Sequence, residues 1–257
     1  MWDPATYLRY AGERGRPFAD LLARVGADDP RTVVDLGCGP GNLTASLADR
    51  WPAASVVGVD SSAAMVQRAR ELARPGLTFA RTDLRDWRPT APVDVLVSNA
   101  TLQWVPGHLD LLPELLGWVA PGGWFAFQVP GNFGEQSHVR LRALAASPRW
   151  RERLPDLDWP AAHDPVAYLE VLAPRAAAVE AWETTYIHVL HGADPVLGWL
   201  RGTALRPVLA ALDPAEQEAF AAELGASLRE AYPSRPYGTV LPYRRVFAVA
   251  QVSRATG

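Results

Sequence analysis

The sequence contains no lysine and a single cysteine, Cys38, among its 257 residues. One cysteine excludes an intramolecular disulfide and a cysteine-based metal cluster, and we expect no metal site. Because lysine is absent, any cationic binding site must be built from arginine. No run of about 18 apolar residues occurs, and the residues from Met1 to Pro4 do not resemble a signal peptide. We therefore expect a cytoplasmic protein that does not cross a membrane.

A large excess of charge of either sign is missing as well. The formal net charge is −3, which argues against nucleic-acid binding because such proteins normally carry a basic patch. The length allows one large α/β domain, and the apolar fraction of 49% is ordinary for a globular protein. We expect a small-molecule partner, neither nucleic acid nor a membrane, and a monomer or weak dimer.

The most informative stretch has the pattern D-x-G-x-G-x-G from Asp35 to Gly41. The preceding run, Thr32–Leu36, is short and β-branched, as is typical of a buried strand, and a helical pattern begins at Asn42. Glycine lets the backbone turn sharply beside a ligand, and the first amides of a helix favour anionic groups. The pattern predicts a loop that binds a nucleoside-like cofactor, with Asp35 meeting its free ammonium group.

Two further carboxylates end or follow predicted strands. Asp60 ends the strand 55–60, and it lies 25 residues after Asp35, close to the separation expected of a ribose-binding acid. Asp83 follows the strand 77–81, where the adenine amino group would be met.

A helix is predicted directly after Asp60. Ser61 or Ser62 would cap it, and Met65 would then fall in its first turn. A methionine there packs either on the adenine or in the ordinary core.

These motifs resemble those of the class I S-adenosylmethionine-dependent methyltransferases. The similar segments are 35–41, Val59-Asp60, 82–84 and 97–100, within roughly residues 30–130. The resemblance implies S-adenosyl-L-methionine as cofactor and a Rossmann-like fold. The residues implied to bind the cofactor are Asp35, Gly37, Cys38, Gly39, Asn42, Asp60, Ser61, Met65, Asp83, Leu84, Asn99 and Ala100.

Strands and helices alternate up to Pro130, which favours an α/β fold with a doubly wound, seven-stranded, mostly parallel sheet. Strands are predicted at 32–36, 55–60, 77–81, 93–98 and 124–129, and helices at 42–50, 62–73 and 108–119. We expect a single domain, 1–257, with a helical cap inserted after strands five and six. Its predicted parts are an N-terminal helical lid or packed helix (1–28), a cofactor-binding core (29–130), cap insertions (131–176 and 191–236) and final strands (177–190 and 237–253).

A more specific resemblance spans nearly the whole chain, including the predicted cap. The segments that carry it are Trp2-Asp3-Pro4, Tyr7, Arg14, Arg16-Pro17, 98–104, 128–133, 182–186, 231–233 and 242–247. They are similar to those of the trans-aconitate 2-methyltransferases. This resemblance implies transfer of a methyl group to one carboxylate of trans-aconitate, which gives a monomethyl ester.

The chemistry of such a transfer requires positioning more than acid–base catalysis. A methyl group on a positively charged sulfur is already activated, and a carboxylate with a pKa near ~4 is ionised at neutral pH. We therefore expect no catalytic acid or base. A tricarboxylate needs cationic partners, for which Arg16 and Arg245 are further candidates besides those below. The residues predicted to bind substrate are Tyr7, Arg14, Gln103, Trp104, Asn132, Tyr186, His188 and Arg244.

Three alternatives stay open from the sequence. A methyltransferase acting on a hydroxyl or an amine of another metabolite would need a base, and His188 lies in a predicted strand that could reach the pocket. An RNA or protein methyltransferase is disfavoured by the acidic balance. A binding module that keeps the pocket as a sensor would hold the cofactor without turnover.

Overall fold

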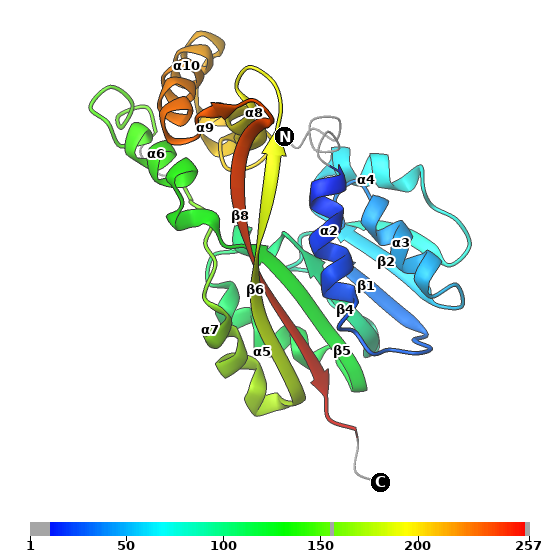
Figure 1. Cartoon of the computed structure of the whole chain (residues 1–257). Coiled ribbons are helices and arrows are strands. Elements are labelled where there is room, and N and C mark those ends of the chain that lie inside the picture. Colours follow the sequence, from blue (N-terminus) through cyan, green and yellow to red (C-terminus); the bar gives the residue numbers. More distant parts are fainter. Residues whose placement is uncertain (1–10, 155–156, 255–257) are drawn as a thin grey trace. The chain divides into compact units, whose positions relative to one another are not determined.

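The structure, a computed structural model, describes residues 11–154 and 157–254. In this part of the chain, strands form one eight-stranded sheet in the order β3-β2-β1-β4-β5-β8-β6, with the short β7 paired to β8 (Figure 1). The strands are β1 (Thr32–Leu36), β2 (Ser55–Asp60), β3 (Leu77–Arg81), β4 (Val93–Asn99), β5 (Val119–Pro130), β6 (Ala176–Leu190), β7 (Ser234–Arg235) and β8 (Gly238–Val252). The mixed α/β sheet predicted from the sequence is confirmed, and the two-residue β7 is the strand it did not anticipate.

Helices connect these strands. They are α2 (Ala11–Leu22), α3 (Asn42–Arg50), α4 (Ala63–Arg70), α5 (His108–Gly117), α6 (Gln136–Ala145), α7 (Pro165–Leu172), α8 (Pro195–Arg201), α9 (Arg206–Ala211) and α10 (Pro214–Ala231), with 3-10 turns at Leu102–Trp104, Asn132–Gly134 and Ala173–Arg175. None of the described helices is long and apolar enough to span a membrane.

The parallel half of the sheet is built from β1 to β5. β1 pairs in parallel with β2 and β4, and the outer pairs β2–β3 and β4–β5 are parallel too. Most of the buried side chains in these strands are apolar, as expected where helices cover both faces of a parallel sheet. The right-handed crossover rule puts α3 and α4 on one face and α5 on the other. The carboxyl ends of β1, β2 and β4 consequently meet at one edge.

The fifth strand is longer than predicted. The sequence 121–123, Pro-Gly-Gly, was expected to precede the strand, but it lies inside β5. Val93 pairs with Val119 and Val95 pairs with Trp124, so the residues between Val119 and Trp124 form a bulge. A bulge accommodates proline and glycine within a strand because those residues are left out of the ladder.

The chain forms two compact units. The first contains the described residues up to 129, 163–183 and those from 246, and the second contains 130–162 and 184–245. In the first unit, Phe18 and Leu21 of α2 are fully buried, so this helix is a packed element. Residues 1–10 lie outside the described part, and the predicted lid therefore stays a prediction.

In the second unit, α10 packs on α6 and α8. Asp213 accepts a hydrogen bond from the backbone N–H of Glu216, and the Glu216 side chain accepts one from the Asp213 N–H, so a capping box starts α10. α7 groups with the first unit, where it packs on α5. The boundaries predicted for the cap remain a prediction.

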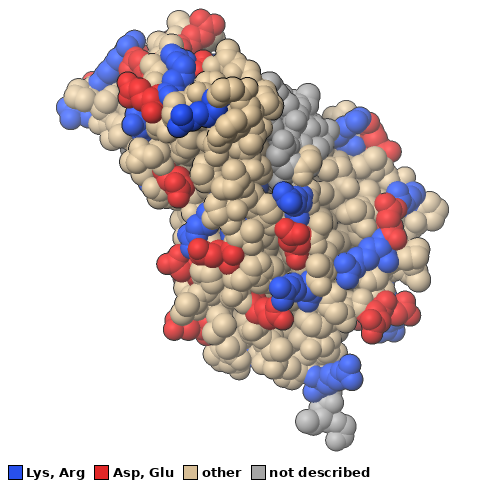
Figure 2. All heavy atoms as spheres, in the orientation of Figure 1, with Lys and Arg blue, Asp and Glu red and all other residues tan. Residues whose placement is uncertain are grey.

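Charged side chains on the face shown in Figure 2 are interspersed in sign. Among the described residues, exposed ion pairs join Arg88 to Glu114 and Arg24 to Glu180, each at 2.8 Å. Exposed pairs of this kind each contribute roughly 0–1 kcal/mol to stability.

Candidate functional site

The loop after β1 contains glycines that differ in how much space surrounds them. Gly37 and Gly39 have φ angles of 80° and 55°, in the left-handed region. A Cβ added at Gly37 would lie 2.0 Å from Thr101 Oγ1, whereas one added at Gly39 would meet no atom within 4 Å. Gly37 is therefore required by packing, and Gly39 borders open space that a ligand can occupy.

Asp60 fastens this loop to the end of β2. Its Oδ2 accepts a hydrogen bond from the Gly39 N–H at 2.9 Å, and its Oδ1 accepts one from the Ser62 N–H at 2.8 Å. Burial raises the pKa of Asp60, although both backbone hydrogen bonds favour the ionised form. Each carboxylate oxygen keeps a second lone pair, so Asp60 remains able to accept from the hydroxyls of a ribose.

Asp35 is a buried acid with an unsatisfied oxygen. Its side chain is 2% exposed, and Oδ2 accepts a hydrogen bond from Thr44 Oγ1 at 2.6 Å. No donor in the described part of the chain reaches its Oδ1. Burial raises the pKa of Asp35 to about 7, the Thr44 hydrogen bond lowers it, and the charge of Asp60 raises it. An ammonium group would donate to the unsatisfied Oδ1 of Asp35, and its positive charge would offset the repulsion between Asp35 and Asp60. The residues therefore fit the predicted cofactor.

Cys38 and Asn42 complete the loop. Cys38 is buried, and burial next to the Asp35 and Asp60 carboxylates strongly raises the pKa of its thiol. A buried thiol that stays protonated is unreactive. Asn42 is the first residue of α3 and is half-buried.

The start of α4 settles one open alternative. Ser62 is its N-cap and accepts from the Met65 N–H at 3.4 Å, whereas Ser61 is exposed. Met65 is buried, at 2% exposure. Packing of Met65 on the adenine stays a prediction.

Asp83 is already engaged by a cation. Nε and Nη2 of Arg85 donate to its two oxygens at 2.9 and 2.8 Å, and this pair lowers the pKa of Asp83. A hydrogen bond from adenine to this carboxylate would share it with Arg85. Leu84 beside it is buried, and both residues stay predicted cofactor contacts.

A strained turn follows β4. Ala100 has a φ of 54°, a conformation that costs a residue with a Cβ about 1–2 kcal/mol. Its N–H donates to the backbone oxygen of Gln128 at 2.9 Å, and its own oxygen accepts from Gln103 Nε2 at 2.6 Å. Asn99 accepts from Gln128 Nε2 at 2.6 Å. The structure thus brings Asn99, Ala100 and Gln103 together, with Trp104 half-buried in the turn that follows.

In the second unit, Tyr186 and His188 of β6 belong to a buried aromatic cluster. The His188 ring stacks on Trp199 with centroids 4.9 Å apart, and it lies 5.8 Å from the Tyr243 ring and 6.5 Å from the Tyr186 ring. This packing places His188 among the buried residues of the unit, and substrate binding by Tyr186 and His188 stays a prediction.

Asn132 and Arg244 connect the segment after β5 to β8. Asn132 Nδ2 donates to the backbone oxygen of Pro242 at 3.3 Å, and Arg244 Nη1 donates to that of Gly131 at 3.4 Å. The neighbouring Arg245 is the more buried of the two arginines, at 4% exposure, and its guanidinium carbon lies 4.6 Å from the Tyr243 ring centroid. Strand alternation indicates that only one of this pair faces a given site, but not which one.

Two predicted substrate residues cannot be placed. Tyr7 lies outside the described residues, and Arg14 lies in α2 but its side chain is not among those described. Their roles stay predictions.

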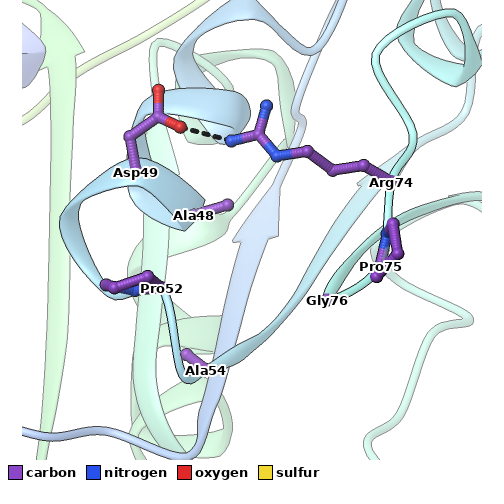
Figure 3. Close-up of a pocket in the computed structure, with 7 residues that line it drawn as sticks. All are labelled: Ala48, Asp49, Pro52, Ala54, Arg74, Pro75 and Gly76. Atoms are coloured by element: carbon purple, nitrogen blue, oxygen red, sulfur yellow. Dashed lines mark hydrogen bonds and ion pairs between the residues drawn. The ribbon is translucent and has the colours of Figure 1, made fainter.

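A surface pocket lies away from this site. It is lined by Ala48, Asp49, Pro52, Ala54, Arg74, Pro75 and Gly76, with an ion pair between Asp49 and Arg74 (Figure 3). These residues precede β2 and β3 or end α3, so the pocket is at the amino ends of those strands. Ligands of doubly wound sheets bind at the carboxyl ends, which excludes this pocket as the cofactor site.

Comparison with known proteins agrees with the geometry. Residues 33–123 match a family model described as a methyltransferase domain. The chain is 55% identical to the trans-aconitate 2-methyltransferase of Streptomyces avermitilis, over 97% of this chain and 96% of the relative. It is 54% identical to the enzyme of the same name from Rhodococcus jostii, over 98% of this chain and 100% of the relative.

Solved structures show the same fold at low identity. The YcgJ protein from Bacillus subtilis superposes with a TM-score of 0.59 and 12% identity, over 94% of this chain and all of that one. A Haemonchus contortus N-methyltransferase bound to S-adenosylhomocysteine superposes with a TM-score of 0.57 and 14% identity, over 93% of this chain and 52% of that one.

Proposed function

The chain belongs to the trans-aconitate 2-methyltransferase family, and on that premise we propose that it methylates one carboxylate of trans-aconitate with S-adenosyl-L-methionine. The product would be a monomethyl ester. The observation that carries this proposal is the extent of the similarity. It covers 97% of the chain at 55% identity and so extends well beyond residue 123, where the methyltransferase-domain match ends.

The first unit would hold the cofactor. The loop around Gly39 leaves room for it, the free lone pairs of Asp60 would accept from its ribose, and Asp35 Oδ1 would accept from its ammonium group. When bound, S-adenosyl-L-methionine supplies a methyl group activated by the positive charge on sulfur. The remaining cofactor contacts proposed here are Gly37, Cys38, Asn42, Ser61, Met65, Asp83, Leu84, Asn99 and Ala100.

The chain's own task toward the acceptor is to orient a carboxylate that is already ionised. No general base is required, because a carboxylic acid has a pKa of about 4 and loses its proton below neutral pH. The acceptor-binding residues that we propose are Tyr7, Arg14, Gln103, Trp104, Asn132, Tyr186, His188 and Arg244, with Arg245, which is buried beside Tyr243 on the other face of β8, as the alternative to Arg244.

The test is transfer of label from methyl-labelled S-adenosylmethionine. We expect label in a base-labile ester of trans-aconitate, with the cis isomer and a saturated tricarboxylate as matched acceptors that react more slowly. We also expect kcat to be flat between about pH 6 and 9, since a carboxylate acceptor with a pKa near 4 does not titrate there.

Two results would contradict this proposal. Transfer to a hydroxyl or amine acceptor, with none to trans-aconitate and with kcat rising with pH, would favour the alternative small-molecule methyltransferase. Binding of S-adenosylhomocysteine without turnover of any acceptor would indicate a sensor.

Cytoplasmic localisation and a monomeric or weakly dimeric state stay predictions.

A further inference from the structure

Asn99 and Gln128 form a buried pair across two parallel strands. They are register partners at the carboxyl ends of β4 and β5, with 8% and 1% of their surfaces exposed. Gln128 Nε2 donates to Asn99 Oδ1 at 2.6 Å, and the Gln128 backbone oxygen accepts from the next N–H along, that of Ala100, at 2.9 Å. Gln128 therefore holds both the side chain of Asn99 and the backbone that follows it.

This contact fixes which end of the Asn99 amide is left for a ligand. A primary amide has an oxygen that only accepts and an NH₂ group that only donates. Since Oδ1 is taken by Gln128, Asn99 presents Nδ2 as a donor. In the part of the chain that the structure describes, we find no protein acceptor for this NH₂ group.

The turn that follows Asn99 is held by hydrogen bonds and lies beside the glycine loop. Thr101 Oγ1 is within hydrogen-bonding distance of the backbone oxygens of both Asn99, at 3.2 Å, and Gly37, at 3.3 Å. Gln103 Nε2 donates to the backbone oxygen of Ala100, the residue in the left-handed conformation, at 2.6 Å. A strained backbone that is clamped in this way is typical of a preorganised binding site.

We propose that Gln128 is a positioning residue, which turns the Asn99 amide so that its NH₂ group donates to a carboxylate oxygen of the bound ligand. That oxygen belongs either to the amino-acid part of the cofactor or to the acceptor. A carboxylate is an acceptor only, so the opposite amide orientation would set oxygen against oxygen and repel it. The part of this inference that concerns the acceptor rests on the proposed function, whereas the cofactor part does not.

The decisive variant is Gln128→Glu, with Gln128→Met as the matched control. A protonated Glu can donate to Asn99 Oδ1 as Gln128 does, but an ionised Glu can only accept, so Asn99 must then turn its oxygen toward the ligand. We expect the ratio of variant to wild-type dissociation constant, or KM, to stay near one at low pH and to rise at least tenfold as the pH increases from 5 to 9. Gln128→Met should show a smaller loss that does not change with pH.

Two readouts separate the possible ligands. Calorimetric titration with S-adenosylhomocysteine reports the cofactor carboxylate and needs no turnover, so it remains informative even if trans-aconitate is not a substrate. The KM for trans-aconitate at saturating cofactor reports the acceptor carboxylate. Asn99→Asp, which accepts from Gln128 but offers a second oxygen, should reproduce the high-pH loss in the same readout at neutral pH.

The inference is overturned if both ratios for Gln128→Glu are flat with pH. It is also overturned if Gln128→Met is impaired as strongly as Gln128→Glu at pH 9, because Gln128 would then contribute packing alone. Thermal unfolding of each variant at the assay pH establishes that the measured losses come from folded protein.

Discussion

Replacing Gly37 by alanine should destabilise the protein through one identified clash. The new Cβ would lie 2.0 Å from Oγ1, 2.3 Å from Cγ2 and 2.6 Å from Cβ of Thr101. Thr101 cannot retreat without loosening its hydrogen bonds to the oxygens of Gly37 and Asn99. Overpacking of this kind costs about 1–3 kcal/mol, and the φ of 80° adds about 1–2 kcal/mol for a residue with a Cβ. We expect a loss of roughly 2–5 kcal/mol in the free energy of unfolding, measured by urea denaturation without ligand.

Gly39→Ala is the matched control because it shares the backbone conformation but not the clash. Its φ is 55°, and the added Cβ would meet no atom within 4 Å. We expect it to lose only the backbone share, about 1–2 kcal/mol. Its Cβ would instead enter the space proposed for the cofactor, so the dissociation constant for S-adenosylhomocysteine should rise at least tenfold.

The two glycines therefore separate stability from binding. Thr101→Gly removes all three clashing atoms, and in the Gly37→Ala background it should recover about 1–3 kcal/mol in a double-mutant cycle. If Gly37→Ala and Gly39→Ala were equally stable, or if Thr101→Gly recovered nothing, the packing argument for Gly37 would be wrong. Unchanged binding in Gly39→Ala would refute the place given to the cofactor.

Two other predictions follow from the buried ionisable groups. Asp60→Ala should weaken S-adenosylhomocysteine binding by roughly 1–3 kcal/mol in calorimetry, because a charge-assisted acceptor is lost, and unchanged affinity would refute its role. His108 hydrogen-bonds Tyr168 at 2.8 Å, and burial, followed by the nearby His163, lowers its pKa to about 4. Between about pH 6.5 and 4 the unfolded chain therefore binds more protons than the folded one, so the free energy of unfolding should fall by about 3 kcal/mol as the pH is lowered through that interval. The variant His108→Gln should show a flatter pH dependence in urea denaturation.

The residues proposed to bind the cofactor could be predicted because they lie at the carboxyl ends of strands in the sequence. Asp35 is the penultimate residue of β1, and Asp60 and Asn99 are the last residues of β2 and β4, so a local pattern is enough to locate each of them. The parallel pairing of β1 with β2 and β4 then brings these ends together. What the pattern could not show is how the carboxylates are already used, as in the pairing of Asp83 with Arg85.

The residues proposed to bind the acceptor were harder to predict because their placement depends on strand register and on which face of a strand is buried. In the sequence, Gln128 is only part of the segment 128–133, and the role that we propose for it depends on its alignment with Asn99 across the sheet. The same limit applies to the arginine pair on β8. Arg245 shares the buried face with Tyr243, while Arg244 is half-buried on the other face, and only packing decides between them.

We expect the buried Asp35 carboxyl to make the ligand-free fold less stable at neutral than at acidic pH. Its pKa rises from 3.8 in the unfolded chain to about 7 in the fold, so the folded state binds the extra proton between these values. The extra proton stabilises the fold fully below pH 3.8. This stabilisation is lost as the pH rises from 3.8 through 7, at about 1.4 kcal/mol per pH unit. Relative to Asp35→Asn, which does not titrate, the wild-type free energy of unfolding should decline across that interval.

Binding should show the opposite dependence in the same pair of proteins. An ammonium group pairs with ionised Asp35, so wild-type affinity for S-adenosylhomocysteine should rise with pH up to about 7, whereas Asp35→Asn should bind weakly and with a flatter profile. If both proteins shared one pH profile in calorimetry, Asp35 would be a purely structural acid. Its unsatisfied Oδ1 would then destabilise the fold without binding the ligand. The hydrogen bond from Thr44 does not offset that cost, because it satisfies only Oδ2.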